Sequence, residues 1–157
     1  MAGGDPDSIS RVAKYGTGWM LTTADPRSIL TMPSDYLPKF ERLNNMAMSK
    51  YSRTVKDFAI DIFACVSSSD DSTASRIASK TIQARLNRQS SVADLKVPSK
   101  EQIEAVNLIG SFKKIARMTE EFERAKVTLL EMKMICWSLE QMKDMMKDFH
   151  QNVMSSF

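Results

Sequence analysis

Apolar residues recur at every third position between residues 37 and 46, which is the spacing of one buried face of a helix. The residues that set this spacing are Leu37, Phe40, Leu43 and Met46. Ser34 and Asp35 precede them and can accept hydrogen bonds from the free backbone N–H groups of a first helical turn. The pattern predicts a helix over about residues 35–48.

The following stretch is more apolar and repeats at steps of three or four residues from Tyr51 to Val66. We expect a second helix over about residues 50–66, buried in the core. A polar run then interrupts the pattern. Weaker apolar spacing, mixed with basic residues, predicts a third helix over about residues 73–88.

The longest pattern lies in the C-terminal third of the chain. Ser99 and Gln102 have the spacing of a capping box, which marks the start of a helix. From Ile115 onward, apolar residues fill eleven of the thirteen a and d positions of a heptad repeat. We expect a helix over about residues 99–155, which either breaks near residues 110–119 or protrudes as a coiled coil and oligomerises.

These patterns together predict an all-α protein, a small helical bundle with a long C-terminal helix or helical hairpin. Residues 1–33 hold four of the five glycines and three of the five prolines without an apolar period, so they are expected to form a partly ordered arm. A chain of 157 residues suits one core rather than two. Residues 34–157 are therefore expected to be a single helical domain.

The C-terminal pattern is apolar around much of its circumference, which is typical of a helix that contacts partners on more than one side. We therefore expect the chain to form a homo-oligomer, and a helical protein partner is a further possibility. The residues expected at the self-association surface are Ile115, Met118, Phe122, Leu129, Met132, Trp137, Leu139 and Met146.

Positive charge is concentrated between residues 76 and 100, where six basic residues accompany one acidic residue, whereas the flanking segments are slightly acidic. This excess favours contact with an acidic partner, RNA or another nucleic acid, and the absence of aromatic residues makes that contact sequence-neutral. A solvated basic helix and phosphorylation of Ser90 or Ser91 are the alternatives. The expected contact residues are Arg76, Lys80, Arg85, Arg88, Lys96 and Lys100.

No combination of residues specifies a reaction. The chain has one histidine, His150, and two well-separated cysteines, Cys65 and Cys136, too few for the usual catalytic or zinc sites. Residues 16–18 lack the further glycine or lysine of a phosphate-binding loop. We therefore expect no catalytic residue, no metal and no cofactor.

We also expect no targeting segment from the sequence. No run of about 18 apolar residues occurs, so no membrane contact is expected, and the free cysteines favour an intracellular protein of the cytoplasm or nucleus. The apolar spacing over residues 37–48 resembles a leucine-rich nuclear export signal, although a core helix produces the same spacing.

The leading functional hypothesis is a non-enzymatic, self-associating interaction protein, an adaptor or regulatory subunit of a kind found also among small viral proteins. Its basic segment would contact an acidic partner such as RNA. The alternative is a structural assembly protein, a helical capsid- or matrix-type subunit that neutralises nucleic acid.

Overall fold

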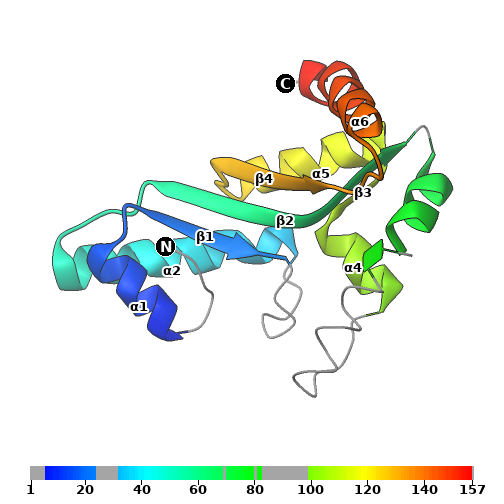
Figure 1. Ribbon diagram of the computed structural model, residues 1–157. Helices are drawn as coiled ribbons and strands as arrows, with labels where there is room; N and C mark the ends of the chain where they lie inside the picture. The colour runs from blue at the N-terminus through cyan, green and yellow to red at the C-terminus, as the bar shows by residue number, and fades with distance from the viewer. Residues whose placement is uncertain (1–5, 24–31, 69, 80, 83–98, 157) are drawn as a thin grey trace.

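The computed structural model of the chain describes residues 6–23, 32–68, 70–79, 81–82 and 99–156. Helices and strands alternate along it (Figure 1). The strands are β1 (Gly18–Thr22), β2 (Asp57–Ser68), β3 (Leu108–Ser111) and β4 (Leu129–Met134). The helices are α1 (Pro6–Tyr15), α2 (Pro33–Tyr51), α4 (Lys100–Val106), α5 (Phe112–Arg124), α6 (Leu139–Asn152) and the short η1 (Met154–Ser156). Residues 71–79 and 81–82 are also helical.

The four strands form one parallel sheet around β2, the longest of them. Residues 59–61 of β2 pair with both β1 and β4, so these two strands lie on opposite sides of β2. Cys65 pairs with both Leu108 and Met134, so β3 lies on the same side as β1. β1 and β3 therefore follow one another along one edge of β2, and β4 takes the other edge.

A buried hydrogen bond joins the end of β1 to the start of β3. The Thr23 hydroxyl donates to Asn107 Oδ1 at 2.7 Å, and Asn107 Nδ2 donates to the Ile103 carbonyl at 2.9 Å. Thr23 is also held to β2, because its backbone N–H donates to the Asp61 carbonyl at 3.0 Å. These bonds satisfy polar groups at the junction of the two strands.

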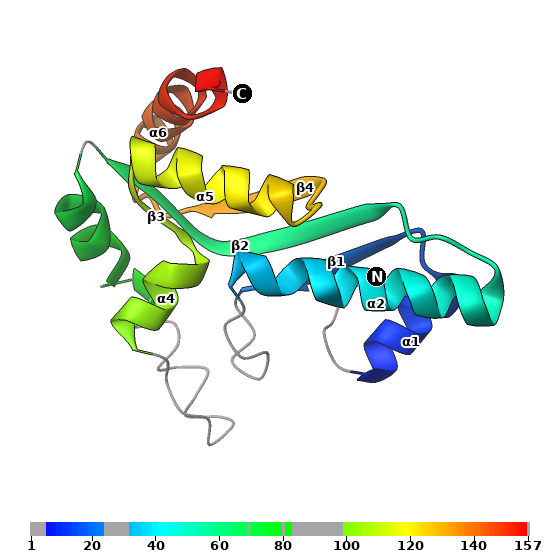
Figure 2. The ribbon, with the colours of Figure 1, turned by 180° about the vertical axis from the view of Figure 1, so that it is seen from behind.

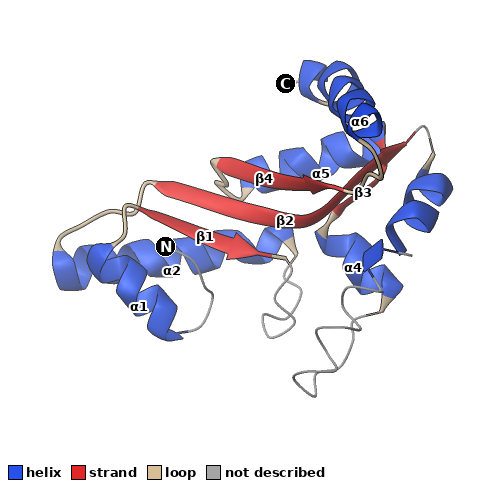
Figure 3. Cartoon of the chain, in the orientation of Figure 1, coloured by secondary structure: helices blue, strands red, loops and turns tan. Residues whose placement is uncertain are grey.

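Helices cover one face of the sheet. In Figure 1 helices α2 and α5 lie behind the strands, and in the reverse view of Figure 2 they lie in front of them. Figure 3 shows the strands uncovered on the side that faces the viewer. Among the described residues, the sheet therefore has a helix-covered face and an open face.

The core lies between the sheet and α2 and α5. Phe58, Ile60 and Ile62 alternate along β2 and are fully buried against these helices. Phe58 stacks on Trp19 of β1 at 5.2 Å and on Phe40 of α2 at 4.8 Å between ring centroids. A smaller cluster consists of Ala74, Ala78, Ile82, Ile103 and Ile109.

The all-α prediction is wrong, because the chain forms a parallel sheet alternating with helices. The first expected helix is confirmed as α2, within which Asp35 Oδ2 accepts from the Met32 N–H at 3.1 Å. The helix expected over residues 50–66 is wrong, since residues 57–68 form β2. A short, almost continuously apolar run fits a buried parallel strand as well as a helix.

The helix expected over residues 99–155 is also wrong, both as a coiled coil and as a helical hairpin broken near residues 110–119. The capping box is present, with Ser99 N–H donating to Gln102 Oε1 at 2.8 Å, but α4 ends at Val106. β3 and β4 then interrupt the segment, and Lys126, with φ of 64°, turns the chain between α5 and β4. A left-handed residue costs a non-glycine side chain some strain and ends a helix.

Residues 1–33, expected to form an arm, contribute α1 and β1 to the structure. Trp19 of β1 is 1% exposed and Val12 and Ala13 of α1 are buried, so both elements belong to the core. None of the described helices is long and apolar enough to cross a membrane.

Candidate functional site

An ion pair lies on the open face of the sheet. Ile60 and Ile62 face the helices, and alternation along β2 turns Asp61 between them to the opposite face. Lys133 of β4 reaches it, with Nζ 2.6 Å from Asp61 Oδ2. The Asp61 side chain is 15% exposed and that of Lys133 is 42% exposed. Asp61 Oδ1 is buried and has no hydrogen-bond partner among the described residues.

Two carboxylates lie where helices begin after the carboxyl ends of β2 and β3. Asp70 accepts from the Thr73 N–H at 2.8 Å and from the Ser72 hydroxyl at 2.6 Å, thereby capping the helix at residues 71–79. These hydrogen bonds, the Ser72 hydroxyl first, lower the pKa of Asp70 to about 2. Asp71 accepts from the Ser111 N–H, and this bond lowers its pKa as well.

Gly110 is needed for this connection between Asp71 and α5. Its φ is +153°, and a Cβ there would lie 2.6 Å from Lys114 Cδ and 2.8 Å from Asp71 Oδ1. A larger residue would displace the carboxylate from Ser111. At the carboxyl ends of β2 and β3, the backbone N–H groups of Thr73 and Ser111 are therefore already bonded to the carboxylates of Asp70 and Asp71.

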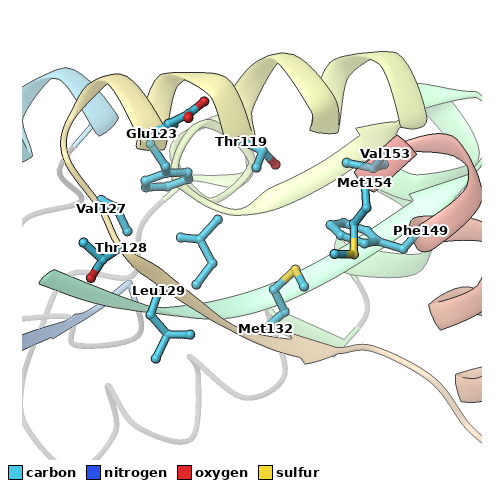
Figure 4. A pocket seen from close by; sticks show the side chains of 11 residues that line it. Thr119, Glu123, Val127, Thr128, Leu129, Met132, Phe149, Val153 and Met154 are labelled. Carbon is cyan, nitrogen blue, oxygen red and sulfur yellow. The ribbon is translucent and has the colours of Figure 1, made fainter. Parts of the chain in front are cut away.

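A pocket of about 280 Å³ lies between α5, β4 and α6, and Figure 4 shows its side chains. Its walls are mainly apolar. The lining residues are Thr119, Phe122, Glu123, Val127, Thr128, Leu129, Leu130, Met132, Phe149, Val153 and Met154. Such a cavity can receive a hydrocarbon or aromatic group, which gains free energy by leaving water.

The hydroxyl groups in the lining bond to backbone atoms. Thr119 Oγ1 donates to the Ile115 carbonyl at 3.0 Å, and Thr128 Oγ1 donates to the Phe58 carbonyl at 3.2 Å and accepts from the Phe58 N–H at 2.9 Å. Glu123 is the one charged lining residue, at the end where α5 finishes. The pocket therefore offers a ligand mostly apolar contacts and few polar ones.

The structure disperses the residues expected at a self-association surface. Ile115, Met118 and Phe122 are buried in the core of the chain itself, so they are not available to a second copy. Met132 is half-buried and lines the pocket with the exposed Leu129. The remaining three, Trp137, Leu139 and Met146, are exposed in and before α6.

The basic segment is only partly described. Arg76 is exposed, and Lys100 lies 3.8 Å from Glu104 in an i,i+4 ion pair. Lys80, Arg85, Arg88, Lys96 and the two serines at 90 and 91 lie outside the described residues. His150 is exposed in α6, and Cys136 is a half-buried free thiol. Sequence reasoning missed the pocket and the Asp61–Lys133 pair because both join residues far apart in the chain.

No protein-family model matches the sequence, and no curated protein matches it. Solved structures share its fold. The coenzyme F420-dependent tetrahydromethanopterin reductase of Methanopyrus kandleri has a TM-score of 0.64 at 14% identity, covering 100% of this chain and 50% of that protein. The FMN-bound oxygenating component of 3,6-diketocamphane monooxygenase from Pseudomonas putida has a TM-score of 0.66 at 10% identity, covering 97% and 46%.

A third structure, the EDTA monooxygenase of a Chelativorans species, has a TM-score of 0.63 at 9% identity and covers 99% of this chain and 45% of its own. The chain thus spans about half the length of these structures. The shared fold is an α/β fold with a parallel sheet, and at these identities the likeness shows the fold alone.

These structures also correct the functional expectations. The three proteins named above are a reductase and two monooxygenases, whereas the sequence pattern suggested a non-enzymatic helical adaptor or a capsid- or matrix-type subunit. Both hypotheses depended on an all-α, coiled-coil structure, which the parallel sheet contradicts. The expectation that the chain is not an enzyme is wrong on the same comparison.

Proposed function

We propose that the chain is one part of an oxidoreductase, and that its own contribution is an apolar pocket that binds the hydrocarbon or aromatic part of an organic substrate. The observation that carries the proposal is the pocket between α5, β4 and α6, on a fold shared with reductases and monooxygenases. A fold alone does not specify a reaction, so the pocket has to supply the chemistry.

The pocket suits such a substrate in size and polarity. Its volume of about 280 Å³ approaches the lower limit of small-molecule sites, and most of its wall is apolar. Leu130 and Met132 come from β4, Phe122 from α5, and Phe149 from α6. Because three elements converge on it, a substrate bound there contacts apolar side chains on several sides, while the exposed Leu129 and Met154 mark the side that opens to solvent.

FMN and coenzyme F420 appear in the names of the similar structures. The described residues fit the flat ring of such a cofactor better than they fit a phosphate. An anion binds best at a helix N-terminus with free N–H groups. Here Asp70 takes the Thr73 N–H and Asp71 takes the Ser111 N–H, and each adds negative charge at that position.

Among the described residues that line the pocket, none carries a basic side chain. A phosphate-bearing cofactor therefore does not fit the described part of this chain as a whole. Its anionic group would have to be held by residues beyond those described, which agrees with a chain that spans half the length of its structural neighbours. We derive no reaction step through such a cofactor.

Pocket binding can be tested with the neutral fluorescent probe N-phenyl-1-naphthylamine, whose emission rises in an apolar site. Met132→Glu places a carboxylate in the apolar wall of the pocket and should weaken probe binding by about tenfold or more, because an apolar ring bound there would have to remove water from the charge. Met142→Glu, the same change at an exposed position of α6, is the matched control and should leave binding unchanged.

A flavin comparison tests the second part of the proposal. Riboflavin and FMN share a ring and differ by a phosphate, so flavin fluorescence quenching should give the two the same affinity within about twofold if no phosphate site is present. Activity is then sought with small apolar ketones and reduced FMN or reduced coenzyme F420. Mass spectrometry scores the gain of two hydrogens without dioxygen, and the gain of one oxygen when dioxygen is supplied as the co-substrate. Equal probe binding in Met132→Glu and Met142→Glu would refute the proposal.

A further inference from the structure

The outer edge of β4 is the second surface that the chain leaves incomplete. Among the described residues, β4 pairs only with β2, so its other edge presents free backbone N–H and C=O groups. Exposed strand edges of this kind pair readily with another strand. The sequence of the strand is Leu-Leu-Glu-Met-Lys-Met, with no proline to prevent pairing.

Apolar and charged side chains alternate along β4 between the two faces of the sheet. Leu130, Met132 and Met134 pack toward the core on the helix-covered face. Glu131 and Lys133 therefore lie on the open face, and both are exposed. Met132 stands midway between one acidic and one basic residue.

We propose that β4 pairs antiparallel with β4 of a second copy of the chain, across a twofold axis at Met132. In that register Glu131 of each copy lies opposite Lys133 of the other, and Leu130 lies opposite Met134. Directly opposed residues in an antiparallel pair share a face, so the two ion pairs form on the open face and the two apolar pairs on the helix-covered face.

The charges of Glu131 and Lys133 favour this register over the two symmetric registers centred on the adjacent residues. Directly opposed residues of an antiparallel pair lie on the same face of the sheet, so a symmetric pair that keeps the two helix-covered faces together is centred on a residue. Centring on Glu131 would place glutamate opposite glutamate, and centring on Lys133 would place lysine opposite lysine. Like charges directly opposed destabilise a sheet, whereas opposite charges stabilise it.

The same register gives Lys133 a second acidic partner. Lys133 already contacts Asp61 Oδ2 at 2.6 Å, and the second copy would add Glu131 beside it, giving an alternating row of acid, base and acid. On the other face, Met132 and Met134 of the second copy would lie beside Leu130 and Met132, which line the pocket. The second copy would thereby extend the pocket wall.

Charge reversal tests the pairing in the full chain, with mass measured by light scattering and sedimentation across concentration. Glu131→Lys opposes lysine to lysine twice and should weaken the dimer by about tenfold or more. Combining it with Lys133→Glu in one chain, or mixing the two single variants, opposes unlike charges again and should restore dimers. Glu41→Lys, an equal change at an exposed position of α2, should leave the dimer intact.

A cysteine scan tests the register itself. In a chain carrying Cys65→Ser and Cys136→Ser, Met132→Cys should cross-link under mild oxidation, because the two copies of residue 132 face each other within disulfide reach. Leu130→Cys should cross-link only when mixed with Met134→Cys, since its own copies would lie about 13 Å apart along the strands. Circular dichroism checks that each variant is folded.

The proposal is overturned if the chain is monomeric at every concentration, if the dimer is as stable with Glu131→Lys as without it, or if Leu130→Cys cross-links alone as readily as Met132→Cys. It does not depend on the substrate pocket, because Glu131 does not line it. Failure of one proposal can therefore be distinguished from failure of the other.

Discussion

The two tryptophans of the chain mark two very different regions. Trp19, in β1, is 1% exposed and stacks on Phe58 beneath α2. Trp137, between β4 and α6, is 64% exposed. The first region completes its own core from residues of four elements, whereas the second leaves large apolar side chains in water. Exposed apolar clusters of this kind in otherwise well-packed proteins mark places where something else binds.

Packing explains the difference. Rings from β1 and α2 pack on Phe58, and Tyr36 of α2 stacks in turn on Phe122 of α5 at 6.0 Å between ring centroids. Each ring covers another, so burial and ring geometry act together. α6 buries Phe149 against the core, while Leu139, Met142 and Met146 on the same helix remain exposed. Both sites proposed above, the pocket and the β4 edge, adjoin this second region.

The strongest test of the contrast removes the ring at the centre of the first region. Phe58→Ala should lower the free energy of unfolding by about 3–5 kcal/mol, because the ring is fully buried and the cavity left behind cannot collapse between two stacked neighbours. Leu129→Ala, at an exposed position of β4, should cost less than about 0.5 kcal/mol. Urea unfolding followed by circular dichroism measures both.

Equal losses in these two variants would contradict the comparison. So would a loss at Leu129 that exceeds the loss at Phe58, because β4 would then belong to the self-sufficient core. The measurement should be made at low concentration, where association of copies through β4 contributes little.

Local signals explain what could be predicted from the sequence. α2 was predictable because its apolar spacing and its start at residues 33–35 lie within one short segment. The capping box at Ser99 and Gln102 was equally local and is present. In both cases neighbouring residues suffice to determine the element, so no distant contact has to be known.

β2 could not be separated from a helix, for a geometric reason. Phe58 and Ile62 are four residues apart, and residues four apart share a face in a strand as well as in a helix, since four is a multiple of the strand period. Ile60, between them, is buried too, which fits the strand alone, but burial is not visible in the sequence. The same coincidence made β4 look like part of a heptad repeat.

The candidate sites were beyond local reasoning. Asp61 and Lys133 are separated by 72 positions and meet only because β4 pairs with β2. The pocket needs residues from 119 to 154 brought together by three elements. On the helices expected from the sequence, Asp61 and Lys133 would be ordinary solvent-exposed charges. Only the register of the sheet brings the two side chains together.

A second test of the packed region uses pH. Burial, with a smaller effect of Asp35, raises the pKa of Tyr36 to about 12. A phenol whose pKa is higher in the folded chain stabilises the fold fully below its unfolded pKa of about 10, and loses that contribution as the pH rises through 12. The wild type should therefore lose roughly 2 kcal/mol between pH 10 and 12.

Tyr36→Phe should remove most of this alkaline loss, because the substituted ring has no proton to release. Tyr15→Phe, at an exposed position of α1, should keep it. Unfolding curves at a series of alkaline pH values would show the difference as a change of slope. Parallel slopes in the wild type and in Tyr36→Phe would show that another group controls alkaline stability.

The smallest expected effect concerns α6, where exposed and buried apolar side chains lie on the same helix. Replacing Leu139 and Met146 together with Gln should change the free energy of unfolding by less than about 0.5 kcal/mol, because both side chains are mostly in water and glutamine favours a helix about as well. Phe149→Gln, at the buried position of the same helix, should by contrast cost about 3 kcal/mol or more. Thermal unfolding of both variants at low concentration measures this. If the exposed pair proved as costly as Phe149, α6 would be packed on all sides, and the second region would be a completed core like the first.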